Sequence, residues 1–186
     1  MDIKYKKEKD LQSHYDNTQY YSPLIGKPYF QNLCNSLKIS MQDINSILDL
    51  GCGDGRLCQH IPKLSTYTGV DYSVKRIELA KKTYPSYKFI AEDLHIFIDT
   101  TDMKPDLIVC VEVLEHLEVP KKLLDIIKDR MPNSIIIGTV PINMPYIAHL
   151  QVWETEEQLK QHLNPDYIKI DPLNKHWMCK WNKYEN

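Results

Sequence analysis

The sequence has no apolar run that approaches the roughly 20 residues needed to span a bilayer as a helix. The charged stretch from Lys4 to Asp10 also lacks the apolar segment of a signal peptide. Internal repeats and low-complexity tracts are missing as well. With 186 residues, of which 42% are hydrophobic, the chain is long enough to bury a full core. These observations predict a cytoplasmic protein without a membrane span.

Neither sign of charge is in large excess, because the formal net charge is only −2 at pH 7. Such a chain creates no global field that would attract nucleic acid or an anionic membrane. This disfavours a nucleic acid partner, although a local basic patch needs no global excess of charge. The composition does not indicate an oligomeric state.

Cysteine pairs at metal-binding spacing are also missing. The five cysteines are scattered, their number is odd, and no Cys-x-x-Cys pair occurs. A disulfide framework or a zinc–thiolate site is therefore disfavoured, and we expect buried free thiols in a reducing compartment. Cys52 lies in a glycine-rich loop, and we interpret it as a small residue of that loop rather than as a nucleophile.

Strand and helix signals alternate along the chain, which predicts an α/β fold with a parallel sheet covered on both faces. Residues 1–40 are expected to form an N-terminal segment with one helix that packs on the core, and residues 41–186 the main domain. That helix should bury Phe30, Leu33, Cys34 and Leu37, which are spaced by three and four residues. Further helices are expected at 56–62, 74–83, 120–130 and 155–162, and strands at 47–50, 67–70, 87–91, 106–112, 134–140, 167–170 and 176–181.

The most informative pattern runs from Ile47 to Gly55 and reads Ile-Leu-Asp-Leu-Gly-Cys-Gly-Asp-Gly. Its apolar start is typical of a buried parallel strand, and the glycines after it let backbone approach a ligand closely. The spacing differs from the Gly-x-Gly-x-x-Gly of dinucleotide sites, and the Asp49 carboxylate would repel a pyrophosphate. The loop therefore favours a cationic ligand over a nicotinamide dinucleotide.

This Asp-x-Gly-x-Gly-x-Gly pattern resembles motif I of the class I S-adenosylmethionine-dependent methyltransferases. The segments 69–71, 91–94, 106–112 and 134–140 resemble the later landmarks of that family, in the same order. The resemblance implies a Rossmann-like, seven-stranded sheet with helices on both faces and an antiparallel last strand. It also implies an enzyme that uses S-adenosylmethionine as its cofactor.

On this frame, several residues acquire cofactor-binding roles. The Asp71 carboxylate would accept two hydrogen bonds from the ribose hydroxyls, and Asp49 would face the amino or sulfonium end of the cofactor. Asp71 is also a candidate helix N-cap, although Ser73 is the better one. Asp93 is expected beside the adenine amino group, with Glu92 as the alternative. The full predicted set is Asp49, Gly51, Cys52, Gly53, Asp71, Tyr72, Glu92, Asp93, Leu94 and Val111.

A second cluster follows the fourth expected strand, where the chain reads Glu-Val-Leu-Glu-His from Glu112 to His116. If a helical turn begins there, Glu112 and Glu115 share one face and His116 stands beside them. Carboxylates and imidazoles together suit a hard or borderline divalent ion. This stretch, with His149 downstream, is similar to the ubiquinone-biosynthesis O-methyltransferases and to the small-RNA 3′-terminal 2′-O-methyltransferases. That resemblance implies a divalent metal held by Glu112, Glu115, His116 and His149.

The same residues have roles that need no metal. His116 and His149 would then be the candidate catalytic residues beside the methyl-transfer site, and the two glutamates would be carboxylates at a helix terminus. Methyl transfer mainly requires that the acceptor is aligned with the methyl carbon and loses its proton. For a hydroxyl acceptor, either histidine would serve as the base.

The acceptor is predicted less directly. The Asn/Asp-Pro-Pro-Tyr/Phe tetrapeptide of many adenine and glutamine N-methyltransferases is missing after the fourth strand, which disfavours N-methylation of nucleobases. We expect O-methylation of a small metabolite, a sugar or a glycan, in a pocket walled partly by Tyr20, Tyr21 and Tyr29. One alternative is metal-assisted 2′-O-methylation of an RNA 3′ end. Another, of a different class, is a non-catalytic partner subunit with a methyltransferase fold.

Overall fold

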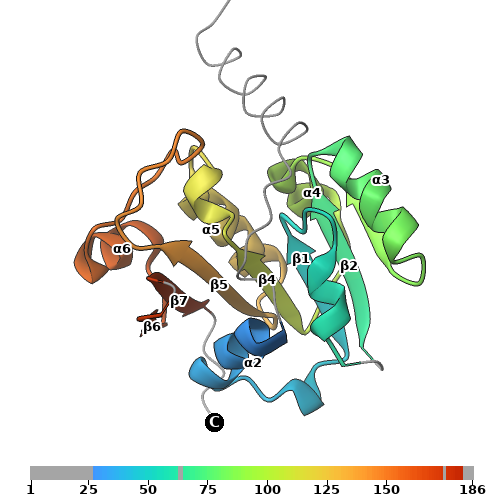
Figure 1. Cartoon of the computed structure of the whole chain (residues 1–186), viewed down its shortest axis with the longest axis horizontal. Helices are drawn as coiled ribbons and strands as arrows, with labels where there is room; N and C mark the ends of the chain where they lie inside the picture. The colour runs from blue at the N-terminus through green and yellow to red at the C-terminus, as the bar shows by residue number, and fades with distance from the viewer. Residues whose placement is uncertain (1–26, 63–64, 174, 182–186) are drawn as a thin grey trace, which may run out of the picture.

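A seven-stranded sheet with the strand order β3-β2-β1-β4-β5-β7-β6 forms the centre of the molecule (Figure 1). The computed structural model describes residues 27–62, 65–173 and 175–181. The strands are β1 (Ser46–Leu50), β2 (Thr66–Asp71), β3 (Lys88–Ala91), β4 (Leu107–Val111), β5 (Ile135–Pro141), β6 (Tyr167–Asp171) and β7 (His176–Trp181). The α-helices are α2 (Lys27–Ser36), α3 (Val74–Thr83), α4 (Leu94–Thr100), α5 (Pro120–Arg130) and α6 (Glu156–Leu163), and the 3-10 helices are η1 (Met41–Asp43), η2 (Arg56–His60) and η3 (Leu114–His116).

The direction of the strands confirms the predicted fold class. Strands β1 to β5 pair in parallel, whereas β7 runs antiparallel to both β5 and β6. The strand order reverses between β1 and β4. In open sheets of this type, ligands bind outside the carboxyl ends of the strands at such a reversal. The edge of the sheet that carries residues 51, 71 and 112 is therefore the place to look for a site.

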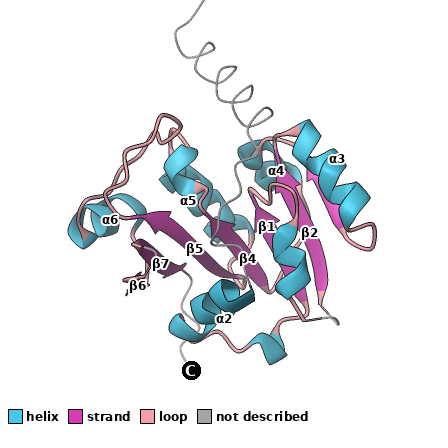
Figure 2. Cartoon of the chain, in the orientation of Figure 1, coloured by secondary structure: helices cyan, strands magenta, loops and turns pink. Residues whose placement is uncertain are grey.

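Helices cover both faces of the sheet (Figure 2), so its central strands are buried on both sides. On one face, Leu48 belongs to an apolar cluster with Leu123 of α5 and Leu159 of α6. On the other, Ile47 belongs to a cluster with Leu33 of α2 and Ile77 of α3. Successive residues of β1 thus enter opposite cores, as the two-residue period of a strand requires. The four apolar residues predicted to form the buried face of α2 are all buried, which confirms that prediction.

Local signals placed most helices correctly. The bounds of α3 and α5 agree with those expected, and Pro120 occupies the first turn of α5. Ser73 is the N-cap of α3, because its hydroxyl accepts a hydrogen bond from the backbone N–H of Arg76 at 3.4 Å. At the start of α6, Thr155 and Gln158 form a reciprocal capping box.

Two helices differ from the expectation. The segment after the glycine loop is the 3-10 helix η2, which ends at His60 and does not continue to Pro62. Its short length follows from its flanks, since Gly55 is left-handed (φ 79°) and Pro62 lacks a backbone donor. The stretch from Leu94, for which no helix was predicted, forms α4, and the Asp93 side chain caps it. All five cysteines are buried and free, as predicted.

The structure bears only partly on the predictions about membrane spans, location, domain boundary and tyrosine-lined pocket. Among the described residues, no helix is long and apolar enough to cross a membrane. The cytoplasmic location and the domain boundary after residue 40 stay predictions. Tyr20 and Tyr21 lie outside the described residues, whereas Tyr29 is a buried residue of α2.

Candidate active site

The glycine-rich loop leaves β1 at the carboxyl edge of the sheet. The backbone N–H groups of Gly51 and Cys52 both donate to the carbonyl of Val70, at 2.8 and 3.1 Å, so the loop turns sharply over the end of β2. Gly51 has φ +74°, and a Cβ atom there would lie 2.4 Å from Cγ2 of Val113. Only glycine satisfies both conditions, because it has no Cβ and tolerates a left-handed backbone.

Asp71 joins this loop to the next one. Its Oδ2 accepts the N–H of Gly53 at 2.9 Å, and its Oδ1 accepts the N–H of Ser73 at 2.9 Å. Each carboxylate oxygen has a second lone pair, so the same group can also accept hydrogen bonds from a ligand diol. Tyr72 follows in the loop after β2. The predicted role of Asp71 in ribose binding fits this position and stays a prediction.

Asp49 lies deeper than expected. Its carboxylate is buried at the end of β1 and accepts a hydrogen bond of 2.5 Å from the Tyr67 hydroxyl. Burial raises the pKa of Asp49 to about 7, and the neighbouring Asp71 charge acts in the same direction. Tyr67 had no predicted role. The sequence held only a weak signal for this contact. Gly69 pairs with Asp49, and Tyr67 lies on the same face of β2 as Gly69 because side chains alternate with a period of two.

The residues after β3 approach the same edge. The N–H of Glu92 donates to the carbonyl of Asp71 at 3.0 Å, which brings the two loops together. Asp93 caps α4 with its Oδ1, which accepts the N–H groups of His95 and Ile96 at 2.8 and 3.1 Å. Leu94 is buried. Whether Asp93 or Glu92 contacts adenine stays a prediction.

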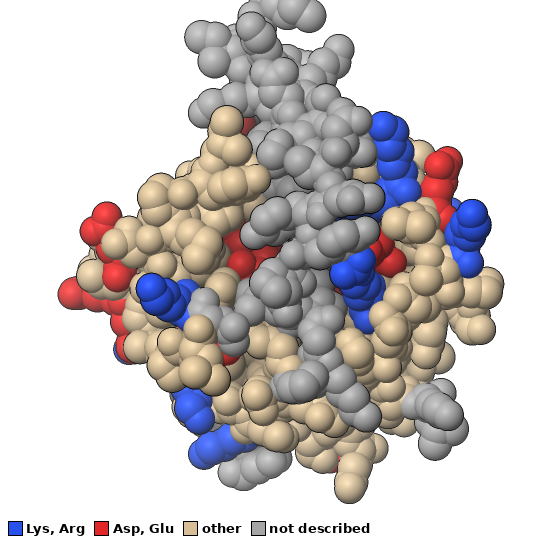
Figure 3. All heavy atoms as spheres, in the orientation of Figure 1, with Lys and Arg blue, Asp and Glu red and all other residues tan. Residues whose placement is uncertain are grey.

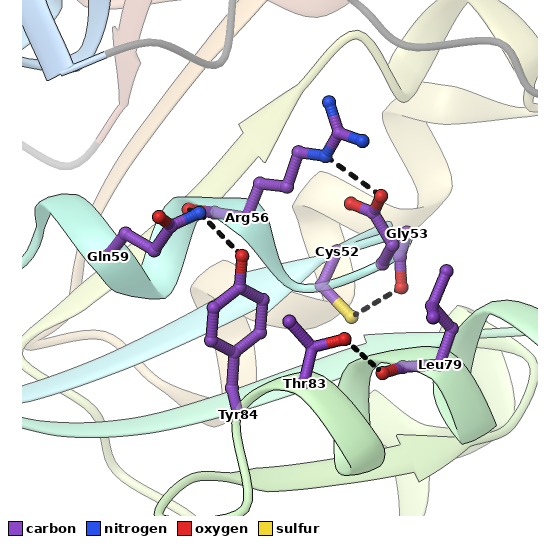
Figure 4. A network of polar contacts seen from close by, with 8 residues as sticks. Cys52, Gly53, Arg56, Gln59, Leu79, Thr83 and Tyr84 are labelled. Carbon is purple, nitrogen blue, oxygen red and sulfur yellow. Dashed lines mark hydrogen bonds and ion pairs between the residues drawn. The ribbon is translucent and has the colours of Figure 1, made fainter.

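Figure 4 shows polar contacts within the glycine loop and the start of η2. Arg56 donates from Nε to Asp54 at 2.8 Å, and the Cys52 thiol lies 3.7 Å from the carbonyl of Gly53. Burial raises the pKa of the Cys52 thiol well above its usual range, and the charges on Asp49 and Asp71 add to this. A thiol held neutral in this way is a poor nucleophile, which agrees with the interpretation of Cys52 as a loop residue.

Three of the four predicted metal ligands come together beside this loop. Glu115 and His116 lie in η3, after β4, and His149 lies in the connection between β5 and α6. One potential ligand atom from each lies within 4.8 Å of the others. The Glu115 Oε1 and His116 Nε2 atoms are 3.7 Å apart, and the two imidazole centroids are 4.9 Å apart. Hereafter we call Glu115, His116 and His149 the Glu–His–His cluster.

Backbone carbonyls orient both imidazoles. Nδ1 of His116 lies 2.9 Å from the carbonyl of Ala148, and Nδ1 of His149 lies 2.7 Å from that of Met144. Because a carbonyl only accepts, each Nδ1 carries the hydrogen, and the lone pair of each ring is on Nε2. This arrangement is the usual support of metal-binding histidines. It equally suits a base that takes a proton at Nε2.

Glu115 has no hydrogen-bond partner for either carboxylate oxygen among the described residues, and its side chain is fully buried. Burial, followed by the nearby Glu112 charge, raises the pKa of Glu115 well above its usual range. A buried carboxylate without a partner is costly unless a cation or a ligand donor meets it. The donor set of the cluster, two imidazoles and one carboxylate, therefore fits a divalent ion.

Glu112 does not join this cluster, contrary to the expectation that it shares a helical face with Glu115. The 3-10 turn begins only at Leu114, and Glu112 precedes it with a left-handed backbone (φ 56°). Its carboxylate instead accepts the Thr139 hydroxyl at 3.0 Å and lies 2.9 Å from Nε2 of His176. His176 had no predicted role, since it begins a strand far along the chain. Val111, half-buried, ends β4 beside Glu112.

Comparison with known proteins agrees with this geometry. A family model described as "Methyltransferase domain" matches residues 16–175. The chain belongs to the class I S-adenosylmethionine-dependent methyltransferases. The predicted family, fold class and enzyme class are thus confirmed, and the match covers the glycine loop, Asp71 and the Glu–His–His cluster.

Individual relatives share parts of this methyltransferase domain. The chain is 33% identical to the mitochondrial ubiquinone biosynthesis O-methyltransferase of Schizosaccharomyces pombe over 102 residues, 50% of this chain and 37% of that protein. It is 28% identical to the trans-aconitate 2-methyltransferase of Enterobacter sp. over 124 residues, 63% of this chain and 47% of that one. The chain therefore spans less than half the length of these relatives.

Solved structures resemble the methyltransferase in fold. The plantazolicin methyltransferase BpumL in complex with SAH superposes with a TM-score of 0.54 at 26% identity, covering 73% of this chain and 54% of the other. The N-methyltransferase NodS from Bradyrhizobium japonicum, also in complex with S-adenosyl-L-homocysteine, gives a TM-score of 0.68 at 16% identity, covering 96% and 99%. The second likeness shows the fold alone.

Proposed function

We propose that this methyltransferase transfers a methyl group from S-adenosylmethionine to the hydroxyl oxygen of a small metabolite, a sugar or a glycan. Family membership and the glycine loop support the cofactor, and relatives named as O-methyltransferases support an oxygen acceptor. The observation that carries the proposal is the Glu–His–His cluster. It lies next to the cofactor loop, because Val113, between β4 and η3, contacts the position of Gly51.

The chemistry follows from these groups. The acceptor oxygen forms a bond to the methyl carbon, the carbon–sulfur electron pair returns to sulfur, and the sulfonium becomes a neutral thioether. The hydroxyl proton must leave, and Nε2 of His116 or His149 accepts it. The carbonyls of Ala148 and Met144 hold both rings in the tautomer that presents a lone pair there. Alignment of the acceptor oxygen with the methyl carbon supplies the rest of the rate enhancement.

A divalent metal fits the same cluster. Glu115, His116 and His149 would hold it, and the ion would supply a Lewis acid that lowers the pKa of an acceptor hydroxyl. The Glu115 carboxyl, which has no hydrogen-bond partner among the described residues, supports this proposal, since a cation would stabilise its ionised form. Glu112, paired with His176, is not required as a ligand.

The alternatives gain no specific support. On the described part of the face in Figure 3, Lys and Arg lie scattered, some of them beside acidic side chains. A groove for RNA would gather them along a track. A non-catalytic subunit needs no oriented imidazole pair beside the cofactor loop. Both alternatives stay predictions.

The first test is calorimetric titration of the purified protein with S-adenosylhomocysteine. Saturable binding that is lost in Asp71→Ala but kept in His60→Gln would establish the cofactor site, because His60 lies in η2 with no role in the cluster. Release of S-adenosylhomocysteine from S-adenosylmethionine is then measured with hydroxyl, amine and thiol acceptors. Turnover of amines or thiols alone would contradict the proposed oxygen acceptor.

A further inference from the structure

A second polar group lies at the same edge of the sheet and is built around Glu112. This residue directly follows β4, and its N–H donates to the carbonyl of Thr139 at 3.1 Å. Its backbone is left-handed (φ 56°), a conformation that is strained for a non-glycine residue. Such conformations cluster at functional sites, where the surrounding structure maintains them.

Two neighbouring strands hold the Glu112 carboxylate. Thr139 of β5 donates its hydroxyl hydrogen to Oε1 at 3.0 Å. His176, the first residue of β7, places Nε2 2.9 Å from Oε2, although 64 residues separate it from Glu112. The antiparallel register of β5 and β7, which pairs Pro141 with His176, creates this meeting. Each oxygen thus has its own partner, which restrains the orientation of the carboxylate.

Glu112 is the more exposed member of this pair. The Glu112 side chain is 19% exposed and that of His176 only 6%. The buried hydroxyl of Tyr29, in α2, lies next to the Thr139 side chain, at a geometry outside that of an ordinary hydrogen bond. Burial raises the pKa of the Tyr29 phenol, and the carboxylate charges of Glu112, Asp171 and Glu115 act in the same direction. Tyr29 is therefore a neutral donor that is held only loosely, by its contact with Thr139.

A loosely held donor beside a partly exposed glutamate favours a ligand that both donates and accepts hydrogen bonds. A hydroxyl group does both. Glu112 precedes Glu115 by three residues and its charge acts on that carboxyl, so a hydroxyl held by Glu112 lies near the Glu–His–His cluster. The position thus meets the requirement that acceptor, base and methyl donor share one edge of the sheet.

We propose that Glu112 recognises the acceptor by accepting the hydrogen of its hydroxyl group, with Tyr29 donating to the same ligand and with Thr139 and His176 as positioning residues. This inference rests on the proposed oxygen acceptor. It assigns the methyltransferase a preference for acceptors with an O–H hydrogen over equally shaped molecules without one. It also gives Glu112 a role that does not depend on a metal.

The test compares two probes, catechol and its dimethyl ether veratrole, which have similar shapes but differ in their O–H hydrogens. Each is titrated into wild-type protein saturated with S-adenosylhomocysteine. We expect catechol to bind about tenfold more tightly or better, the size of one hydrogen bond to a charged group. Glu112→Gln should bring the ratio of the two dissociation constants close to one without changing the affinity for S-adenosylhomocysteine.

Matched variants of Thr139 and His176 distinguish a role in positioning Glu112 from a general loss of structure. Thr139→Val and His176→Leu remove the donors to Glu112 and should reduce the preference for catechol several-fold, whereas Thr139→Ser and His176→Gln keep a donor and should restore it. Wild-type protein that binds S-adenosylhomocysteine but fails to prefer catechol, whether it binds both probes or neither, would overturn the inference. A preference that survives in Glu112→Gln would overturn it too. Failure of wild-type protein to bind S-adenosylhomocysteine would instead count against the proposed function.

Discussion

The position of the missing Cβ of Gly51 lies 2.4 Å from Cγ2 of Val113. The glycine loop at the end of β1 and the turn at the end of β4 are therefore in direct contact. This contact places the cofactor loop and the Glu–His–His cluster side by side, and any side chain at position 51 would push them apart.

Gly51→Ala should consequently weaken S-adenosylhomocysteine binding and lower stability. The left-handed backbone costs about 1 kcal/mol for a non-glycine residue, and overpacking against Val113 adds roughly 1–3 kcal/mol. The midpoint temperature of thermal unfolding should therefore fall by several degrees. Calorimetry should show the loss of affinity for S-adenosylhomocysteine. In a Val113→Ala background the crowding is relieved. Adding Gly51→Ala to Val113→Ala should therefore cost less stability than Gly51→Ala costs in the wild-type protein. No recovery in the double variant would show that the two residues are not coupled.

Asp71→Asn should weaken S-adenosylhomocysteine binding by about tenfold or more, since one charged hydrogen-bonding group is worth roughly 1.5–3 kcal/mol. The amide loses one acceptor oxygen and turns a donor toward the N–H of Gly53 or Ser73. Glu92→Gln, in the neighbouring loop, tests the carboxylate expected as the alternative contact to adenine, and His60→Gln is the control. A loss of affinity in His60→Gln as large as that in Asp71→Asn would argue against a specific role of Asp71.

Asp49 should make the stability of the protein depend on pH. Its pKa is about 7 in the folded state against 3.8 as the reference value, so the folded protein binds a proton more tightly than the unfolded chain. The stabilising contribution is therefore complete below about pH 4 and is lost as the pH rises through about 7, by at most about 4 kcal/mol.

Urea unfolding of wild type and Asp49→Asn between pH 5 and 8 measures this contribution. The asparagine variant keeps an oxygen for the Tyr67 hydroxyl and cannot ionise. Its stability relative to wild type should rise with pH across that window. Since Glu115 adds a slope of the same sign to both proteins, the difference between them is the informative quantity. Parallel curves would show that Asp49 does not titrate there.

His149→Gln should weaken the binding of Co²⁺ or Zn²⁺ by about tenfold or more, since one of the three proposed metal ligands is lost. Glu115→Gln should have the same effect, whereas Glu112→Gln and the control His60→Gln should not. Calorimetry gives the affinity, and the visible absorption of Co²⁺ reports its coordination. Undiminished binding in His149→Gln and Glu115→Gln would refute the proposed metal site and leave the two histidines as candidate bases.

The sequence by itself determined the features that local chemistry controls. The apolar run of β1, the glycine loop after it and the helices α3 and α5 could be predicted because each depends on residues close together in the chain. The Ser73 cap and the Thr155–Gln158 capping box are of the same kind. The order of these elements, together with the glycine spacing, was enough to indicate the fold and the family.

Only the tertiary structure decided which side chains meet at the edge of the sheet. It turned Glu112 toward Thr139 and His176 instead of Glu115. It also enclosed Glu115 without a hydrogen-bond partner from the described part of the chain and set Tyr67 against Asp49. These contacts join segments brought together by the strand order, in which β4, β5 and β7 are neighbours. No local pattern encodes them, because the partner of each polar group is chosen by which strand lies beside it and by the direction of its backbone.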